Sequence, residues 1–184
     1  MKRLVLGTAQ LGMNYGIANR TGQPDSKTSE SIIKTAWDFG IREFDTAQAY
    51  GKSEQVLGHC LSSLGITDKA LVTSKTHPDL DHLDSKKMRM ALETSLNNLN
   101  CDHLNGYLLH TEELLDKWDK GLGEILVRFV EKDRLVKNIG VSVYSPDRAI
   151  QALENKHISI VQVPSNILDR RFEDASVFDL AGHL

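Results

Sequence analysis

The sequence contains little cysteine, little net charge and no long apolar run. Cys60 and Cys101 are its two cysteines and form no Cys-x-x-Cys pair, which argues against a disulfide framework and favours a reducing, cytoplasmic setting. The net charge of −3 gives no indication of a surface for nucleic acid or for an anionic membrane. No stretch approaches the roughly 18 apolar residues that a membrane helix needs. The apolar residues 4–6 are too few for a signal peptide.

Two sequence motifs that would indicate other classes of protein are also missing. Residues 7–12 read Gly-Thr-Ala-Gln-Leu-Gly, which does not fit the Gly-x-Gly-x-x-Gly of a dinucleotide-binding doubly wound sheet. The first predicted strand has no His-x-His, which a metal-dependent hydrolase of the barrel type would need. His77 and His82 flank Asp79 and Asp81, but a solvated loop is the better interpretation of this polar segment. We therefore predict no resident metal ion.

What the sequence does contain is a regular alternation of short apolar runs and longer helical patterns. Runs rich in β-branched residues predict six strands, at 3–7, 42–46, 71–75, 106–110, 139–143 and 160–164. None alternates cleanly between apolar and polar residues, as expected for parallel strands with covered faces. Apolar residues at helical spacing predict helices at 29–39, 53–64, 85–99, 122–132 and 147–155, with a sixth near Arg171.

Strict β-α alternation with crossovers of this length predicts an α/β fold with a parallel sheet. An open doubly wound sheet and a closed barrel both satisfy the pattern, and the missing glycine motif favours the barrel. A complete (β/α)8 TIM barrel has eight strands and takes about 250 residues, whereas six strands are counted here. We therefore expect residues 1–184 to form a single barrel domain that is incomplete, with about six of eight strands, and truncated at its C-terminus.

Three consecutive predicted strands end at ionisable residues. Asp45, Lys75 and His110 lie at the carboxyl ends of the second, third and fourth strands, and Tyr50 follows on the loop after Asp45. In a barrel the catalytic groups gather at the carboxyl ends of the strands. The acid, the amine, the imidazole and the phenol are therefore expected at one rim, although they are distant in sequence.

This set of side chains suits the reduction of a carbonyl group. A hydride that arrives at the carbonyl carbon leaves negative charge on the oxygen, and a positioned acid must supply a proton. Tyr50 would be that acid, with Lys75 as the nearby cation that favours the phenolate. Asp45 would keep Lys75 charged in a partly dry pocket. Neutral His110 would orient the carbonyl oxygen or help to relay the proton.

Each residue also has a simpler interpretation when it is taken alone. Asp45 could cap a loop or helix, Lys75 could be a solvated charge, and Tyr50 could be a packed ring with its hydroxyl in water. His110 on an apolar strand is more often a structural histidine. Their joint occurrence, in order and at strand ends, favours the catalytic interpretation.

With these residues in place, the sequence resembles the aldo-keto reductase family. The resemblance is carried by Leu6-Gly7-Thr8, Asp45-Thr46-Ala47-x-x-Tyr50-Gly51-x-x-Glu54, Thr73-x-Lys75, Leu108-Leu109-His110, Ile139-Gly140-Val141-Ser142 and Val161-Gln162. These segments follow the family's order over nearly the whole chain. The resemblance implies an NAD(P)H-dependent oxidoreductase that reduces an aldehyde or ketone to an alcohol, with a small-molecule carbonyl substrate and Tyr50 as the proton donor.

The resemblance also implies the residues that bind the cofactor, which is NADPH, with NADH as the second option. Ser142 and Gln162 would contact the nicotinamide amide, Thr8 would border the ring, and Asp45 would belong to the same site. Val143 stands where the family usually has an asparagine. The family's seventh and eighth strands hold the ring-stacking residue and the phosphate site, and they have no counterpart in the 184 residues.

A second hypothesis stays open because of those two strands. The chain could be a truncated or remnant barrel that has the catalytic rim without full cofactor binding and acts as a binding or structural module, or is inactive alone. A six-stranded barrel would expose two edge strands, which are templates for pairing with another chain. Self-association through the exposed barrel edges is therefore expected, whereas no nucleic-acid or membrane partner is.

Overall fold

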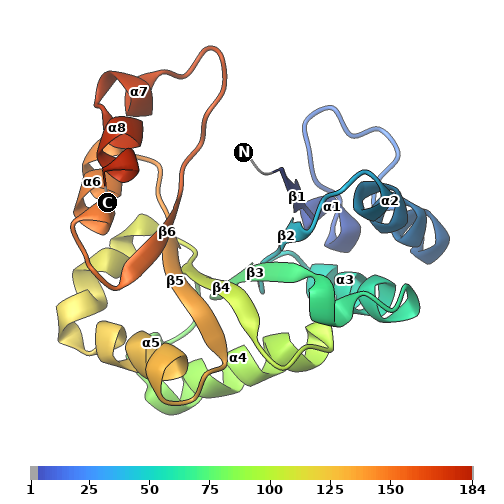
Figure 1. Cartoon of the computed structure of the whole chain (residues 1–184), viewed down its shortest axis with the longest axis horizontal. Coiled ribbons are helices and arrows are strands. Elements are labelled where there is room, and N and C mark those ends of the chain that lie inside the picture. Colours follow the sequence, from blue (N-terminus) through green and yellow to red (C-terminus); the bar gives the residue numbers. More distant parts are fainter. Residues whose placement is uncertain (1–3, 184) are drawn as a thin grey trace.

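Six parallel strands lie side by side in the order in which they occur in the sequence (Figure 1). The computed structural model describes residues 4–183. Its strands are β1 (Val5–Gly7), β2 (Glu43–Asp45), β3 (Leu71–Lys75), β4 (Leu104–Leu109), β5 (Val136–Ser142) and β6 (Ile158–Gln162). A doubly wound sheet would reverse this order at a switch point. The uninterrupted order identifies a half-barrel, with β1 and β6 as its end strands, and confirms the predicted α/β barrel class.

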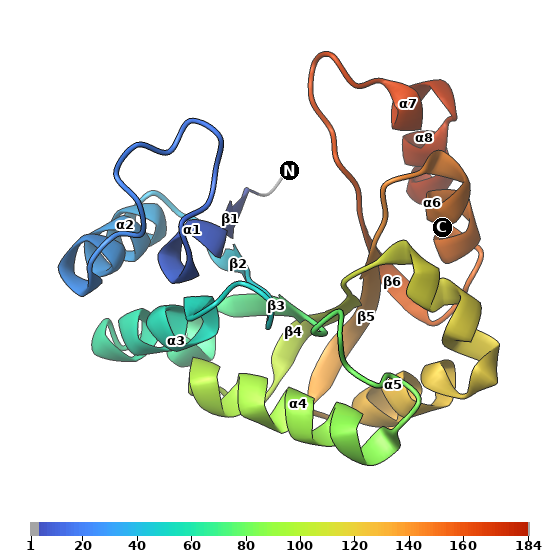
Figure 2. The same ribbon diagram turned by 180° about the vertical axis from the view of Figure 1, so that it is seen from behind.

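Helices connect successive strands and cover the outer face of the curved sheet. In both views α3, α4 and α5 follow the outside of the arc, while β1 and β6 stay apart at its ends (Figure 1 and Figure 2). The helices are α1 (Ala9–Gly12), α2 (Ser26–Asp38), α3 (Ser53–Ser63), α4 (Ser85–Leu99), α5 (Leu122–Glu131), α6 (Pro146–Leu153), α7 (Arg171–Asp174) and α8 (Val177–Gly182), with 3₁₀ helices η1 (Thr67–Lys69) and η2 (Glu112–Lys120). In the part of the chain that the structure describes, no helix has the length and apolar character needed to cross a membrane.

Helix α4 illustrates how the sequence determines an element. The carboxylate of Asp84 accepts hydrogen bonds from the backbone N–H groups of Lys86 and Lys87, an N-cap that stabilises a helix by about 1 kcal/mol. Asn100 ends the helix in the left-handed conformation with a φ of 55°, which asparagine tolerates better than most residues. The predicted bounds, 85–99, agree with the structure.

The main core lies between the sheet and the helices that cover it. Phe44 on β2 and Tyr107 on β4 are fully buried there. From the helices the core receives Ile33, Leu57, Leu61, Met88, Leu92 and Leu99. Each large apolar side chain that is removed from water contributes about 1.5–3 kcal/mol. This packing holds β2, β3 and β4 in a fixed relation to one another, and so it also fixes their carboxyl ends.

Several predicted boundaries were wrong by a few residues. Helix α2 begins before the predicted residue 29 because Asp25 caps it and accepts a hydrogen bond from the N–H of Thr28. Strand β4 ends one residue before His110, so His110 is the first residue after the strand. The short α1 and the 3₁₀ helix η2 were not predicted. Arg3, the first residue of the first predicted strand, lies outside the described residues.

Candidate active site

The four predicted catalytic residues meet at the carboxyl ends of β2, β3 and β4. Asp45 and Lys75 are the last residues of β2 and β3, and the two strands are paired in the sheet. The ammonium group of Lys75 donates to Oδ1 of Asp45 at 2.7 Å and to Oδ2 at 2.6 Å. It also donates to the carbonyl oxygen of Thr46 at 3.0 Å. Lys75 is buried, with 1% of its side chain exposed, so this ion pair is shielded from water.

Tyr50 lies between the cation and the imidazole. Its hydroxyl oxygen is 3.5 Å from Nζ of Lys75, and the same Nζ lies 5.1 Å from the centroid of the tyrosine ring. The rings of Tyr50 and His110 meet edge to face, with centroids 5.6 Å apart and planes inclined by 82°. The structure thus brings all four side chains into one contact group, as the strand-end positions predicted.

The pKa of Lys75 is lowered from its ordinary value. Burial is the main cause, and the charge of Asp45 and its hydrogen bond oppose the shift. This agrees with the expectation that Asp45 helps the lysine to keep its proton.

The pKa of Tyr50 is raised, although a nearby cation such as Lys75 would by itself lower it. Burial raises the pKa of Tyr50 to about 12, and the carboxylate of Asp45 raises it further. Because Lys75 gives its hydrogen bonds to both oxygens of Asp45, the pair presents little net positive charge to the phenol. Tyr50 therefore holds its proton firmly at neutral pH instead of being poised to lose it.

His110 has the neutral state that the sequence predicted. Burial lowers the pKa of its imidazole, and the charge of Lys75 lowers it further. Within the described residues its Nδ1 is buried and makes no hydrogen bond. A buried polar atom without a partner is uncommon in proteins, and here it belongs to a ring that faces Tyr50.

The three further residues predicted to bind the cofactor differ in where their side chains lie. Ser142 and Gln162 are register partners at the ends of β5 and β6, and Nε2 of Gln162 donates to Oδ1 of Asp45 at 3.2 Å. This bond joins the last strand of the half-barrel to β2. Thr8 is fully buried, and its hydroxyl donates to the carbonyl oxygen of Asp45 at 2.8 Å and lies 2.8 Å from Oγ of Ser53. The Thr8 side chain thus braces the rim from behind.

A backbone contact that the sequence interpretation missed holds the Tyr50 turn in place. A Cβ on Gly12 would lie 2.0 Å from the carbonyl oxygen of Tyr50 and 2.2 Å from the backbone nitrogen of Ser53. Gly51 has a φ of +58°, and a Cβ there would lie 2.5 Å from the carbonyl oxygen of Gly12. The two glycines therefore let α1 pack directly against the turn. The signal for this contact in the sequence was the pair of glycines at positions 12 and 51.

Ser53 and Glu54 form a buried polar network behind the rim. Oγ of Ser53 donates to the carbonyl oxygen of Thr8 at 2.8 Å and accepts from Oγ1 of Thr46 at 3.0 Å. Glu54 is buried, and its carboxylate accepts from Oγ of Ser74 at 2.6 Å. Each of these polar groups has a partner, so the network ties α3 to β2 and β3 without leaving a buried group unsatisfied.

The histidines of the segment after β3 do not form a metal site. Over residues 4–183 no group of three or more His, Cys, Asp or Glu side chains is placed to hold a metal ion. His77 is exposed beside Asp79, as expected for a solvated loop. His82, however, is buried with its Nε2 3.1 Å from Oγ1 of Thr76. This residue does lie in a loop, but the expectation that it is solvated was wrong.

Two further aromatic residues, Trp118 on η2 and Tyr144 after β5, lie outside the group of four catalytic residues. The ring of Trp118 stacks on His157, with centroids 6.5 Å apart, and fills the space above Gly123. It therefore packs as a structural residue. Tyr144 is 59% exposed on the loop after β5.

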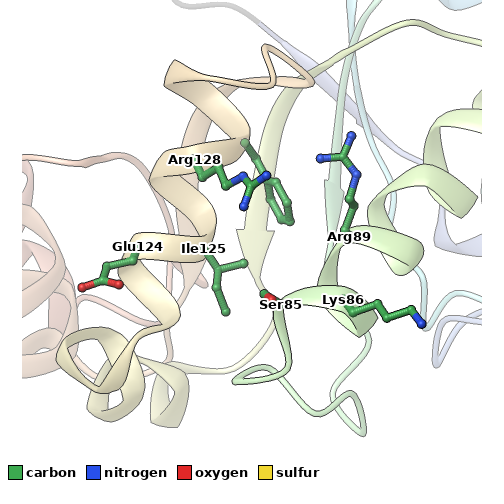
Figure 3. Close-up of a pocket in the computed structure, with 7 residues that line it drawn as sticks. Ser85, Lys86, Arg89, Glu124, Ile125 and Arg128 are labelled. Carbon is green, nitrogen blue, oxygen red and sulfur yellow. The ribbon is translucent and has the colours of Figure 1, made fainter.

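A hollow of about 500 Å³ lies between α4 and α5, apart from the rim (Figure 3). It is lined by Ser85, Lys86, Arg89, Glu124, Ile125, Arg128 and Phe129. The guanidinium groups of Arg89 and Arg128 lie 2.7 Å and 3.6 Å from Oδ2 of Asp133. Since acids already pair with both arginines, and none of the four rim residues lines the hollow, we do not place the chemistry there.

Known proteins resemble the chain over almost all of its length. The model of the aldo/keto reductase family matches residues 3–183. The chain belongs to the aldo/keto reductase family. It is 27% identical over 181 residues to aldo-keto reductase YhdN of Bacillus subtilis, covering 94% of this chain and 53% of that protein. It is 30% identical over 177 residues to the probable aldo-keto reductase 1 of Glycine max, covering 90% of this chain and 51% of that protein.

Solved structures show the same relation. A putative aldo-keto reductase of Pseudomonas aeruginosa, PA4992, superposes with a TM-score of 0.80 and 25% identity, covering 96% of this chain and 68% of that one. The thermostable aldo-keto reductase Tm1743, solved with the inhibitor epalrestat, gives a TM-score of 0.76 and 25% identity, covering 97% of this chain and 64% of that one. The chain spans about half the length of the curated relatives that it matches over most of its residues. The predicted family is confirmed, and the half-barrel corresponds to part of the family's barrel.

Proposed function

We propose that the rim reduces an aldehyde or ketone to an alcohol, with the hydride from NADPH and the proton from Tyr50. The observation that carries this proposal is the contact group of Asp45, Lys75, Tyr50 and His110, with Lys75 Nζ 3.5 Å from the tyrosine hydroxyl. Membership of the aldo/keto reductase family supports it. When bound, NADPH would supply the hydride for the carbonyl carbon.

The side chains of the rim hold and donate the proton. Tyr50 keeps its proton at neutral pH because burial and Asp45 raise its pKa. When hydride addition puts negative charge on the substrate oxygen, the phenol donates its proton to that oxygen. The phenolate that remains is stabilised by Lys75, and Asp45 holds the lysine in position. His110, neutral and in contact with the tyrosine ring, can orient the carbonyl oxygen by hydrogen bonding.

The ends of β5 and β6 fit the amide end of a nicotinamide ring. Ser142 and Gln162 are register partners, so a hydroxyl and a carboxamide lie side by side and can both donate to and accept from an amide. We propose that these two residues hold that group, with Asp45 beside the ring. Thr8, which was predicted to border the ring, is fully buried and supports Asp45 from behind the rim instead. NADPH is the first candidate, and NADH is to be compared with it directly.

The names of relatives suggest where to begin with substrates. Methylglyoxal reductase DkgA of Escherichia coli is 34% identical over 117 residues, covering 60% of this chain and 38% of that protein. The D-arabinose 1-dehydrogenase of Saccharomyces cerevisiae is 30% identical over 152 residues, covering 78% of this chain and 43% of that protein. We propose a small carbonyl compound as the substrate, handled in the cytoplasm, and methylglyoxal as the first member of a test panel.

The test is the oxidation of NADPH by the 184-residue chain with a panel of small aldehydes and ketones. Turnover is expected in the wild type, with a loss of about a hundredfold or more in Tyr50→Phe because general acid catalysis contributes roughly 10²–10⁴-fold. Unchanged turnover in Tyr50→Phe would contradict the role given to this residue.

A second candidate function is that of a barrel module that associates with itself and binds the cofactor weakly. The exposed apolar residues at the ends of the sheet favour it. Leu4 and Val5 at β1 are 75% and 51% exposed, and Ile167 and Leu168 on the loop after β6 are both 92% exposed. Titration of NADPH fluorescence separates the two candidates, because binding at micromolar concentrations would count against the module.

A further inference from the structure

Gln48 lies in the turn between Asp45 and Tyr50 and is tied to the protein by its whole amide group. Its Oε1 accepts a hydrogen bond of 2.7 Å from the backbone N–H of His77. Its Nε2 lies 2.9 Å from the carbonyl oxygen of Ala91 and 2.9 Å from Oγ of Ser95. The same Nε2 lies 3.1 Å from the hydroxyl of Tyr107. The donor and acceptor capacity of this side chain is thus used within the protein.

These contacts join the Tyr50 turn to each neighbouring element that carries a rim residue. His77 is on the loop that follows Lys75 and β3, and Tyr107 is on β4, three residues before His110. The backbone N–H of Gln48 also donates to the carbonyl oxygen of Lys75 at 3.2 Å. One residue therefore connects the turn to the segments of Lys75 and His110 and, through Ala91 and Ser95, to α4.

The environment of these bonds makes them suited to holding a position. Ser95 is fully buried, and Tyr107 is 1% exposed. Hydrogen bonds in such a place exchange little with water and are stronger than at the surface. In the described part of the chain, by contrast, the Tyr50 hydroxyl has one polar contact, at 3.5 Å from Nζ of Lys75, besides the ring contacts with Lys75 and His110. The position of the phenol therefore depends strongly on the turn that carries it.

We propose that Gln48 is a positioning residue, whose amide fixes the Tyr50 turn so that the phenol lies against Lys75 and His110. The contribution of Gln48 to catalysis rests on the reduction proposed above. Its effect on the position of the phenol can be measured whether or not the protein catalyses that reduction. Misplacing a reacting group by about 1 Å can cost about a hundredfold in rate, so loosening the turn lowers kcat more than it changes KM.

Gln48→Met tests this proposal because methionine keeps the length of the side chain and removes its hydrogen bonds. The same change removes the hydrogen bond between Gln48 and the buried hydroxyl of Tyr107, so a loss of stability is expected as well. The double variant Gln48→Met with Tyr107→Phe removes the hydroxyl that would be left without this bond. Gln55→Met is the matched control, since Gln55 is exposed on α3 just beyond the turn.

The first measurement is the NMR signal of Tyr50 in protein labelled with ¹³C at the tyrosine hydroxyl carbon, assigned with Tyr50→Phe. Lys75→Met gives the reference for a phenol that has lost its cation. In Gln48→Met the signal is expected to move toward that reference, and in Gln55→Met it stays in place. The double variant is expected to regain thermal stability while its Tyr50 signal remains displaced.

The second measurement is steady-state reduction with NADPH. In Gln48→Met and in the double variant, kcat is expected to fall roughly ten- to a hundredfold with KM little changed. A Tyr50 signal in Gln48→Met that coincides with the wild type overturns the proposal. So does recovery of both the signal and kcat in the double variant, which would mean that Gln48 only satisfies Tyr107. If the wild type shows no turnover, the proposed function fails, and the NMR comparison still decides the role of Gln48.

Discussion

Asp45 affects the pKa of two neighbouring side chains at once. Burial by itself lowers the pKa of Lys75, and the carboxylate of Asp45 opposes that shift. The same carboxylate adds to the effect of burial in raising the pKa of Tyr50. Asp45 therefore helps to keep the lysine charged and the tyrosine protonated. These are the two states that proton transfer to a carbonyl oxygen requires at its start.

The pH dependence of turnover tests the state of His110. Because burial and Lys75 lower the pKa of this imidazole from 6.5, it should become charged only below that pH. If the neutral ring orients the substrate, kcat/KM stays level from neutral pH upward until Tyr50, with a pKa of about 12, begins to ionise. It falls on the acid side below pH 6.5.

A His110→Gln variant keeps a hydrogen-bonding group but cannot titrate, so the acid limb should disappear while kcat/KM falls. Measurement of kcat/KM against pH for both proteins checks this. An acid limb that is the same in His110→Gln as in the wild type would assign the limb to another group.

At the scale of single residues, the sequence could predict which side chains form the site but not their pKa values. Asp45, Lys75 and His110 share a rim because the position of a residue at a strand end determines which face it meets. The pKa of Tyr50 depends on two distances from Nζ of Lys75, one to the carboxylate of Asp45 and one to the phenol oxygen. That comparison requires distances of 2.6 Å and 3.5 Å, which no spacing in the sequence contains. The role of Gln48 was hidden for the same reason, since its partners come from three different elements.

The close approach of α1 to the Tyr50 turn gives a prediction at the scale of an element. In Gly12→Ala the new methyl group would lie 2.0 Å from the carbonyl oxygen of Tyr50, so α1 or the turn must shift. Such overpacking typically costs about 1–3 kcal/mol of the free energy of unfolding. We expect a loss of this size in urea unfolding, together with lower kcat because Tyr50 moves.

The control for this prediction is Gly182→Ala, because a Cβ on Gly182 meets no atom within 4 Å and its φ is not positive. It is expected to change stability by less than about 0.5 kcal/mol. Equal stability of Gly12→Ala and the wild type would show that the turn does not depend on this contact.

The elements that the sequence predicted well are those with local signals. Helix α4 has a cap at Asp84, a left-handed residue at its end and a regular apolar face, so its bounds follow from the sequence. The 3₁₀ helix η2 was missed because its start depends on contacts far along the chain. Glu112, its first residue, accepts hydrogen bonds from the N–H groups of Tyr144 and Ser145. Long-range contacts of this kind leave no periodic pattern in the sequence.

Residues 4–183 form a half-barrel, and within them each of the two end strands, β1 and β6, pairs with one neighbouring strand. The order of strands could be predicted in part, since β-α alternation allows a barrel or a doubly wound sheet. The uninterrupted order from β1 to β6 decides for the barrel. The hydrogen bond from Gln162 to Asp45 spans this sheet from β6 to β2. The geometry of the rim therefore depends on the curvature of the whole sheet.

The free edge of β1 gives a prediction about association. A strand with unpaired backbone groups can pair with another chain, and charged side chains on the edge prevent this. We expect the wild type to form dimers as concentration rises, and Val5→Lys to raise the dissociation constant about tenfold, or about 1.4 kcal/mol. Light scattering after size-exclusion chromatography checks it.

Phe39→Lys serves as the control for this prediction, since Phe39 is 86% exposed at the end of α2, outside the β1 edge. An equal effect of the two lysines, or a monomer at every concentration, would contradict pairing through the edge.

We propose that Asp45, Tyr50, Lys75 and His110 form a rim at which a carbonyl group takes a hydride from NADPH and a proton from Tyr50. The most direct measurement is a single turnover with NADPH carrying deuterium at the transferable position and methylglyoxal as substrate, followed by mass spectrometry of the product. The claim predicts one deuterium in the alcohol product of the wild type and a rate at least about a hundredfold lower in Tyr50→Phe. Bound NADPH with no deuterated product from the wild type, or equal rates for the two proteins, would contradict it.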